Sequence, residues 1–429
     1  MEEKLALFGG RPVRQKPYPF YNTIGSKEKE SVLEVLNSGL LSGFSARGNA
    51  QFLGGKYVRK FEELFGRKFN SKYAVSFNSA TSGLHGALVA AGVGPGDEVI
   101  VPCYSMSATA AAVLMCYAAP IFVDVEPDMF CLDPDKLPLA ITGRTKAIIT
   151  VNLFGMPSDL ASISALARKH DLVLIEDNAQ APGARYHGKF AGTVADMGVF
   201  SLNRHKTIQC GEGGVVLTNN KFFAERLQLV RNHGEVILLE WGRDEHADIV
   251  GHNYRLSEVH AAIAIAQTGK LDALNKYRID LAGYLTKMLK NISFLRSPVI
   301  RDNCNHVFYL YPMLYDKKAL GISRDTLLNA LQAEGICVSN YVAPIYHCPL
   351  FQKYQRAEEK DFIKRFPGYD SIPDYSPGIC KEAELLYEQK IIATPICRQP
   401  QLKKDIEQFI GALKKIERNI DELLKYEKA

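Results

Sequence analysis

Three stretches of the sequence carry side chains that could act together on one ligand. The stretch 77–88 (FNSATSGLHGAL) is a Ser/Thr/Gly turn that opens a helix, and the free N–H groups and dipole of a helix start attract phosphate. The stretch 172–184 (LVLIEDNAQAPGA) is an apolar strand that ends in carboxylates, among them Asp177. The stretch 201–214 (SLNRHKTIQCGEGG) places Lys206 in a loop that bears glycines and hydroxyl groups. Together they offer an anion site, a carboxylate and an amine.

Each stretch taken singly has an ordinary explanation as a capped helix, a loop at a strand end, or a solvated lysine. Their order along the chain favours a shared role, because the carboxyl ends of parallel strands in one sheet meet at one edge. A cofactor with a phosphate, a ring nitrogen that a carboxylate stabilises and an aldehyde that condenses with an amine would use all three stretches. Pyridoxal 5'-phosphate has these groups.

The elements that must position these residues alternate between short β-branched runs and helical segments, which is typical of βαβ units. The pattern predicts strands at 73–77, 98–102, 120–125, 146–154, 172–177, 197–202 and 214–219. Between them it predicts helices, among them one that Gly92 ends and one that Ser158 opens. The predicted fold class is therefore α/β, with a large, doubly wound, mostly parallel sheet of seven strands.

The rest of the chain predicts a second, smaller domain. The stretch 257–289 has the periodicity of one or two long helices, followed by an α+β pattern with a strand at 306–315 and a helix at 325–335. We therefore predict an N-terminal segment and large cofactor-binding domain over 1–270 and a smaller C-terminal domain over 271–429. The stretch from about 352 to 386 is rich in charge, Pro, Gly and Tyr, which predicts an inserted loop that could border the cleft between the domains.

Composition excludes several classes of protein. The 52 Lys and Arg residues barely exceed the 47 Asp and Glu residues and are spread along the chain, so nothing indicates nucleic-acid binding. The nine cysteines are scattered and never spaced C-x-x-C, which predicts reduced thiols without a disulfide framework, zinc or another metal. The N-terminus does not resemble a signal peptide, and no apolar run is long enough to span a membrane, so a cytoplasmic protein is expected.

The chain resembles the DegT/DnrJ/EryC1/StrS family of sugar aminotransferases, which are fold-type I enzymes that use pyridoxal phosphate. The resemblance extends over nearly the whole chain and rests on motifs that occur in the family's order. These motifs are LFGGRPVR, LNSGLLSG, FLGGKYVRKFEELF, NSATSGLHGAL, GDEVIVP, IEDNAQAPGA, FSLNRHKTIQCGEGG, VRNHGE and GHNYRLSEVHAAI. Any one of them would be weak, and the ordered set carries the resemblance.

The resemblance implies a role for several residues around the cofactor. Lys206 would form the Schiff base and then move a proton as general acid and base. Asp177 would keep the pyridine nitrogen protonated, which makes the ring an electron sink. Gln180 would approach the ring near its phenolic oxygen.

The resemblance also implies a shared phosphate site. The residues expected to hold the phosphate are Thr81, Ser82 and Ser201 from the same subunit and Asn253 from a partner subunit. A homodimer with shared active sites is therefore expected.

Some positions depart from the family pattern. Met106, in PCYSMSA, stands where an aromatic residue often stacks on the ring, and its thioether could cover the ring instead, with Tyr104 as a possible substitute. His205 stands where Thr is frequent before the lysine, so it either touches the substrate or the phosphate side of the ring or only fills space. His347, in APIYHCPLF, matches a stretch near the family's substrate and is a further substrate-side candidate.

The implied function is transfer of an amino group from L-glutamate or L-glutamine to the keto group of a nucleotide-linked keto-sugar, in amino-sugar biosynthesis. A cyclitol ketone or a keto-shikimate-like acid is an alternative acceptor. A keto-sugar dehydratase of the same family would carry histidine at the position of Lys206, so the lysine favours transamination. A non-enzymatic sensor would be expected to lose one of the cofactor residues, and all of them are present.

Overall fold

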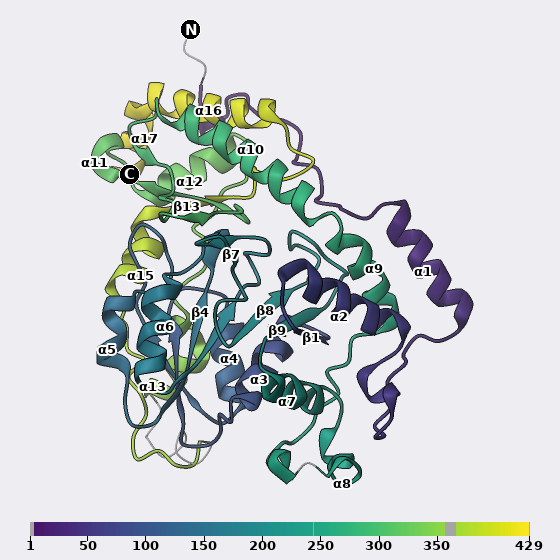
Figure 1. Cartoon of the computed structure of the whole chain (residues 1–429). Helices are drawn as coiled ribbons and strands as arrows, with labels where there is room; N and C mark the ends of the chain where they lie inside the picture. Colours follow the sequence, from purple (N-terminus) through teal and green to yellow (C-terminus); the bar gives the residue numbers. More distant parts are fainter. Residues whose placement is uncertain (1–3, 243, 357–365, 429) are drawn as a thin grey trace.

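The computed structural model describes residues 4–242, 244–356 and 366–428, with a seven-stranded sheet at its centre (Figure 1). In spatial order the strands are β1 (Tyr73–Phe77), β9 (Gly214–Thr218), β8 (Met197–Ser201), β5 (Val173–Asp177), β4 (Thr145–Val151), β2 (Glu98–Pro102) and β3 (Ala119–Val123). All neighbours are parallel except β9, which runs antiparallel to β1 and β8. The predicted fold class and its seven strands are confirmed.

Helices cover both faces of this sheet, because its strands bury side chains on both sides. In β2, Val99 and Val101 join the core under α3 (Ala80–Ala90) and α4 (Ala108–Met115), while Ile100 joins the core under α6 (Leu160–Lys169). Alternate residues of a strand point to opposite faces, so an unbroken apolar run marks a strand that is covered twice.

Two predicted boundaries were wrong for local reasons. The strand predicted to reach residue 154 ends at Val151, because Phe154 takes a left-handed backbone with φ 56°. The helix α6 is opened by Asp159, whose carboxylate accepts from the Ser162 amide at 3.2 Å, and not by Ser158. The hydroxyl of Ser158 is buried and donates to the Val151 carbonyl, so it holds the end of β4 instead.

The stretch 257–289 forms two helices, α9 (Glu258–Thr268) and α10 (Leu271–Leu289), and α10 leads to a smaller sheet at the top of Figure 1. That sheet contains β10 (Leu295–Arg296), β12 (Tyr311–Tyr315) and β13 (Ile391–Thr394). The helices α12 (Arg324–Ala333), α16 (Lys403–Arg418) and α17 (Ile420–Lys428) contribute to the core around it. Only the second half of the predicted strand 306–315 is β-structure, and residues 306–310 form a loop. None of the helices in the described part of the chain combines the length and apolarity needed to cross a membrane.

The N-terminal segment packs on the C-terminal core. Leu5 is fully buried in the cluster around the small sheet. The carboxylate of Glu334 accepts from the amides of Ala6 at 2.8 Å and Val13 at 2.9 Å, and the ammonium of Lys415 lies 3.0 Å from it. The division into domains at residue 270 stays a prediction. The N-terminal segment, which we assigned to the first domain, packs on the core of the predicted second domain.

The predicted insertion at 352–386 does not border the Lys206 region in its described part; residues 357–365 lie outside the described residues. After α13 (Pro349–Arg356) the chain returns to the large sheet, where Tyr369 and Tyr375 join the core next to β3. The Tyr375 hydroxyl donates to the Pro120 carbonyl at 3.2 Å. These residues cover the β3 edge of the sheet, because an uncovered edge strand would expose unpaired backbone groups.

Candidate active site

A cavity of about 300 Å³ lies at the carboxyl ends of the central strands, between them and the loop 306–310. Seven of the predicted site residues line it: Thr81, Met106, Asp177, Gln180, Ser201, His205 and Lys206. Three do not, namely Ser82, Asn253 and His347. The three stretches singled out in the sequence therefore meet at one cavity.

Lys206 lies in the loop that joins β8 to the antiparallel strand β9. The loop is closed by backbone hydrogen bonds, including Lys206 N–H to the Asn203 carbonyl at 2.9 Å, and the Tyr21 hydroxyl donates to the Thr207 carbonyl at 2.7 Å. The amine lies 4.9 Å from the centre of the Tyr309 ring. Burial lowers the pKa of Lys206 to about 8, although the Asp177 charge opposes this shift. About a tenth of this amine is therefore uncharged at pH 7 and about half at pH 8, far more than for an ordinary lysine.

Asp177 ends β5 and is 5 % exposed. Its carboxylate accepts from the Thr109 hydroxyl at 3.2 Å and from the Ala179 amide at 3.1 Å. Burial raises the pKa of Asp177, while the Ala179 N–H group and the Lys206 charge act in the opposite direction. A cationic partner in the cavity would favour the ionised carboxylate.

Glu176 precedes Asp177 in β5 and points to the opposite face, as adjacent strand residues must. Its carboxylate accepts from the amides of Gly192 at 2.6 Å and of Val194 and Ala195 at 2.9 Å each. Of the two neighbouring carboxylates, only Asp177 faces the cavity, and Glu176 holds the 192–195 loop in place.

The predicted phosphate turn is the start of α3. Ser79 caps the helix, accepting from the Ser82 amide at 3.0 Å, and the first N–H groups of a helix have no partner inside it. Ser82 does not line the cavity, because its hydroxyl donates to the Asn78 side chain at 2.6 Å. Gly214 lets β9 pass close by: a Cβ at this position would lie 2.6 Å from the Ala80 amide nitrogen. Thr81 and the cap residue Ser79 are the hydroxyl residues of the turn that line the cavity.

Gln180 is held by two hydrogen bonds that fix its amide. Its oxygen accepts from the Phe154 amide at 2.9 Å, and its nitrogen donates to the Tyr341 hydroxyl at 2.7 Å. Tyr341 and Tyr309 both line the cavity and were not predicted. They come from the C-terminal part of the chain, where no motif marks them, and Tyr309 falls in the stretch that we predicted as a strand.

Met106, Tyr104 and His205 were predicted to contact the cofactor ring or the substrate, and the structure places each of them in a different environment. Met106 lines the cavity and is 58 % exposed, so its thioether is free to cover a ring. Tyr104 cannot substitute for it, because the Tyr104 side chain is fully buried and packs edge-on against Tyr341, with 5.6 Å between ring centres. His205 lines the cavity, and burial, together with the nearby Lys206 charge, lowers the pKa of its imidazole.

Two further predicted residues lie away from this cavity. His347 is 2.9 Å from the Glu384 carboxylate of α15 (Lys381–Leu385), so the substrate-side role that we expected is not supported by its position. Asn253 is exposed and pairs with Asn232 in a backbone bridge just before α9. Its expected reach into a partner subunit stays a prediction.

Cys103, Asp124 and Cys380 form a buried group of metal-ligand types, with ligand atoms within 4.8 Å of one another. The Asp124 carboxylate, however, already accepts from two backbone amides at the start of α15, each at 2.9 Å, and from the Lys136 ammonium at 3.1 Å. These bonds give the Asp124 carboxylate a structural role, since it links the end of β3 to the start of α15.

The side chains and N–H groups that line the cavity match the chemical groups of pyridoxal phosphate. Among the described residues the Lys206 amine has no hydrogen-bond or ion-pair partner, although burying such a group without one is costly. The amine, the Asp177 carboxylate and the start of α3 surround one space of about 300 Å³. An aldehyde, a ring nitrogen and a phosphate on one molecule would meet these three groups.

Comparisons with known proteins agree with this chemistry. A profile described as "DegT/DnrJ/EryC1/StrS aminotransferase family" matches residues 24–365. GDP-perosamine synthase of Caulobacter vibrioides is 35% identical over 76% of this chain and 82% of its own length. L-glutamine:2-deoxy-scyllo-inosose aminotransferase of Streptomyces lividus is 35% identical over 83% of this chain and 85% of its own. The solved structure of Helicobacter pylori PseC, an aminotransferase involved in the biosynthesis of pseudoaminic acid, superposes with a TM-score of 0.77 and 26% identity, over 94% of this chain and 100% of that one.

Proposed function

Because this chain belongs to the DegT/DnrJ/EryC1/StrS aminotransferase family and is a pyridoxal-phosphate-dependent aminotransferase, we propose that it aminates a nucleotide-linked keto-sugar. The amino donor in this proposal is L-glutamate or L-glutamine, and the product is an amino sugar. One observation carries the proposal: a buried lysine with a lowered pKa, a buried carboxylate and a helix start share one cavity.

The residues of the cavity divide the work of holding the cofactor. The start of α3 with Thr81 would hold the phosphate, because the positive end of a helix offers N–H donors, and the hydroxyl of Ser201 at the end of β8 would add another donor. Asp177 would pair with the ring nitrogen and Gln180 would meet the ring edge. Met106 would cover one face of the ring. When bound, pyridoxal phosphate supplies an aldehyde that condenses with amines and a ring that accepts electrons.

The protein itself supplies the proton transfers. In its uncharged form the Lys206 amine accepts the proton from the substrate carbon that bears nitrogen, and in its charged form it returns the proton. A pKa of about 8 places both forms within reach near neutral pH. The Asp177 carboxylate, held by Thr109 and by the Ala179 amide, would stabilise a proton on the ring nitrogen of the bound cofactor.

The two relatives support different acceptors. The name of GDP-perosamine synthase contains a nucleotide sugar, and the name of the Streptomyces lividus relative contains a cyclitol ketone. A cyclitol ketone is therefore the second candidate acceptor, with the same donor chemistry. The name of the second relative also favours L-glutamine as a donor to include in any assay.

A Lys206→Ala variant tests the catalytic assignment. The holoenzyme should convert bound pyridoxal phosphate to pyridoxamine phosphate when L-glutamate or L-glutamine is added, and the variant should lose this by at least about 1,000-fold. Lys221→Ala is the matched control, because its side chain is 67% exposed at the start of α7 (Lys221–Arg231). Turnover at the normal rate in Lys206→Ala would refute the assignment.

A second measurement tests the acceptor. The pyridoxamine form of the enzyme is offered nucleotide-linked 3-keto and 4-keto sugars, a cyclitol ketone and a keto-shikimate-like acid, and regeneration of pyridoxal phosphate is followed by its visible absorbance. Regeneration by a nucleotide-linked keto-sugar supports the proposal. Regeneration by the cyclitol ketone alone would overturn the proposed substrate class and leave the aminotransferase activity intact.

A further inference from the structure

An aromatic ring, that of Tyr309, lies over the Lys206 amine. The ring centre is 4.9 Å from the amine nitrogen, and the amine has no hydrogen-bond or ion-pair partner among the described residues. A lysine side chain is flexible and its ammonium group is a point charge without a preferred direction. The face of an aromatic ring attracts a cation within about 6 Å. A ring at this place can therefore orient the amine and shield it from water.

The loop that carries Tyr309 has a backbone that needs support. Phe308 has a positive φ of 49°, which is rare for a bulky residue and persists only where the surroundings hold it. The Phe308 amide donates to Nδ1 of the buried His306 at 2.8 Å, and the two rings stack with 4.0 Å between their centres. The Val307 amide donates to the Gly155 carbonyl at 3.0 Å. These contacts fix the amides of the loop, whereas the Phe308 and Tyr309 carbonyls bond to a different part of the chain.

The donor to these two carbonyls is Arg278, on α10. Its Nη1 group donates to the Phe308 carbonyl at 3.3 Å and to the Tyr309 carbonyl at 3.1 Å. Arg278 is 2% exposed and forms no ion pair with a carboxylate among the described residues. Burial of a cation without a carboxylate is costly, and here the two carbonyls offset part of that cost. Arg278 therefore ties the loop of Tyr309 to the long helix.

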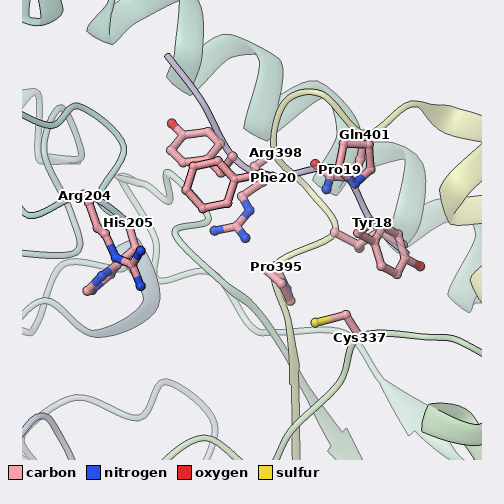
Figure 2. Close-up of a pocket in the computed structure, with 11 residues that line it drawn as sticks. Tyr18, Pro19, Phe20, Arg204, His205, Cys337, Pro395, Arg398 and Gln401 are labelled. Carbon is pink, nitrogen blue, oxygen red and sulfur yellow. The ribbon is translucent and has the colours of Figure 1, made fainter. Parts of the chain in front are cut away.

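Arg278 is also connected to the loop of Lys206, through Tyr21. The guanidinium carbon of Arg278 lies 5.4 Å from the centre of the Tyr21 ring, and the Tyr21 hydroxyl donates to the Thr207 carbonyl at 2.7 Å. The guanidinium carbon of Arg398, which Figure 2 shows in a neighbouring cavity, lies 5.0 Å from the same ring centre. Contacts between cations and the ring, together with the hydrogen bond of the hydroxyl, hold Tyr21 in place. One arginine is thus joined both to the ring that covers the amine and to the loop that carries the amine.

We propose that Tyr309 and Arg278 are positioning residues for the Lys206 amine: the Tyr309 ring orients the amine for proton transfer and keeps water from it, and Arg278 holds that ring in place. The inference rests on the proposed function, because it takes Lys206 as the residue that moves the proton. The rate of such a step depends steeply on position, and a displacement of about 1 Å can cost about 100-fold. The Tyr309 hydroxyl has no hydrogen-bond partner among the described residues, so the effect is assigned to the ring.

The first test compares Tyr309→Ala with Tyr309→Phe in the pyridoxal phosphate holoenzyme. Formation of pyridoxamine phosphate is followed in a single turnover over a range of L-glutamate and L-glutamine concentrations. In Tyr309→Ala the rate at saturation should fall about 10- to 100-fold, while the half-saturating concentration stays within about 3-fold of wild type. Tyr309→Phe keeps the ring, so its rate should stay within about 2-fold of wild type.

Three outcomes of this comparison would overturn the inference. A Tyr309→Ala enzyme with the rate of wild type would show that the ring does not position the amine. A Tyr309→Phe enzyme as slow as Tyr309→Ala would assign the effect to the hydroxyl. A raised half-saturating concentration with an unchanged rate at saturation would make Tyr309 a residue that binds the donor.

A double-mutant cycle tests whether Arg278 acts through the ring. Arg278→Gln alone should lower the rate at saturation about 10-fold or more. Combined with Tyr309→Ala it should be no slower than the slower single variant, because two residues that act on one contact are not additive. Effects that multiply would show that Arg278 acts elsewhere and would overturn its assigned role. If Arg278→Gln does not fold, Arg278→Lys, which keeps a donor for the carbonyls, is used in the same cycle. Lys276→Gln is the control on the same helix, since Lys276 is 77% exposed beside Asp280, and its rate should match wild type.

A second readout needs neither cofactor nor turnover. The apoprotein is acetylated briefly with acetic anhydride at pH 11, where about 80% of ordinary lysines are uncharged. Lys206 should be labelled about 3-fold faster or more in Tyr309→Ala and Arg278→Gln than in wild type, because the ring no longer covers the amine. In Tyr309→Phe the labelling should equal that of wild type. Equal labelling of Lys206 in wild type and Tyr309→Ala would refute the shielding.

Failure of the proposed function gives a different pattern. If Lys206→Ala keeps the reaction with L-glutamate or L-glutamine, the proposed role of Lys206 is wrong and this inference falls with it. If Lys206→Ala loses the reaction but Tyr309→Ala keeps it, the proposed function stands and only this inference is wrong.

Discussion

In protein freed of its cofactor, Lys206 should react with an amine reagent at a much lower pH than surface lysines do. Its pKa is lowered from the ordinary 10.5 to about 8, because burial disfavours the charged form more than Asp177 favours it. At pH 8 about half of the Lys206 amines are then uncharged, compared with about 0.3% of ordinary lysines, which is an advantage of about 150-fold. The expected difference is large enough to measure residue by residue.

The assay is trace acetylation with acetic anhydride, a reagent small enough for a cavity of about 300 Å³. The apoprotein is labelled briefly between pH 6 and 11, digested, and the Lys206 peptide is compared with peptides that carry surface lysines. Labelling of Lys206 should rise with a midpoint near pH 8. Because the Asp177 charge raises the pKa of Lys206, Asp177→Asn should move this midpoint lower still.

Glu212→Gln is the matched control, because Glu212 lines the same cavity but does not shift the pKa of Lys206. Its midpoint should equal that of wild type. A midpoint for Lys206 near 10.5 would refute the reasoning, since it would mean that burial does not act on this amine. A midpoint that rises in Asp177→Asn would refute the assigned sign of the interaction.

Two further predictions concern the scaffold of the site. Glu176→Gln should lower the free energy of unfolding by about 2 to 4 kcal/mol in urea titrations. The reason is that the amide NH₂ of the new side chain would face the N–H groups of Gly192, Val194 and Ala195. A change below about 0.5 kcal/mol would contradict this. Gly214→Ala should weaken binding of pyridoxal phosphate to the apoprotein about 10-fold or more in fluorescence titrations, because the new methyl group meets the start of α3; unchanged affinity would show that this helix start does not hold the phosphate.

The large sheet could be predicted because its strands are continuous apolar runs between clear turns. Runs of this kind mark strands that are buried on both faces, and Val99 to Val101 show both faces being used. The Asp177 and Lys206 positions followed from the same logic, since Asp177 is the last residue of a predicted strand and Lys206 lies in the loop after another. The antiparallel direction of β9 could not be predicted from such a pattern, because a buried strand has the same composition whether it runs parallel or antiparallel to its neighbours.

The other half of the site could not be predicted from the sequence. Tyr309 and Tyr341 line the cavity from loops of the C-terminal part. Phe308, just before Tyr309, and Tyr341 itself have positive φ values, although neither is a residue type that predicts such a backbone conformation. Ser82 is a different case: its predicted phosphate contact stays a prediction, and in the structure its hydroxyl donates to the Asn78 side chain and accepts from the Ser79 amide at the start of its own helix. Local hydrogen bonds of this kind compete with ligand binding and depend on rotamers that a motif does not specify.

The packing of the N-terminal segment has a consequence for the order in which the protein assembles during synthesis. Ala6 and its partner Glu334 are 328 residues apart, and Arg14 pairs with Asp405 at 2.6 Å. The N-terminal segment therefore leaves the ribosome early but finds its place only when the last helices emerge. The large sheet can form while the chain is still growing, whereas the docking of the N-terminal segment waits for contacts of long range.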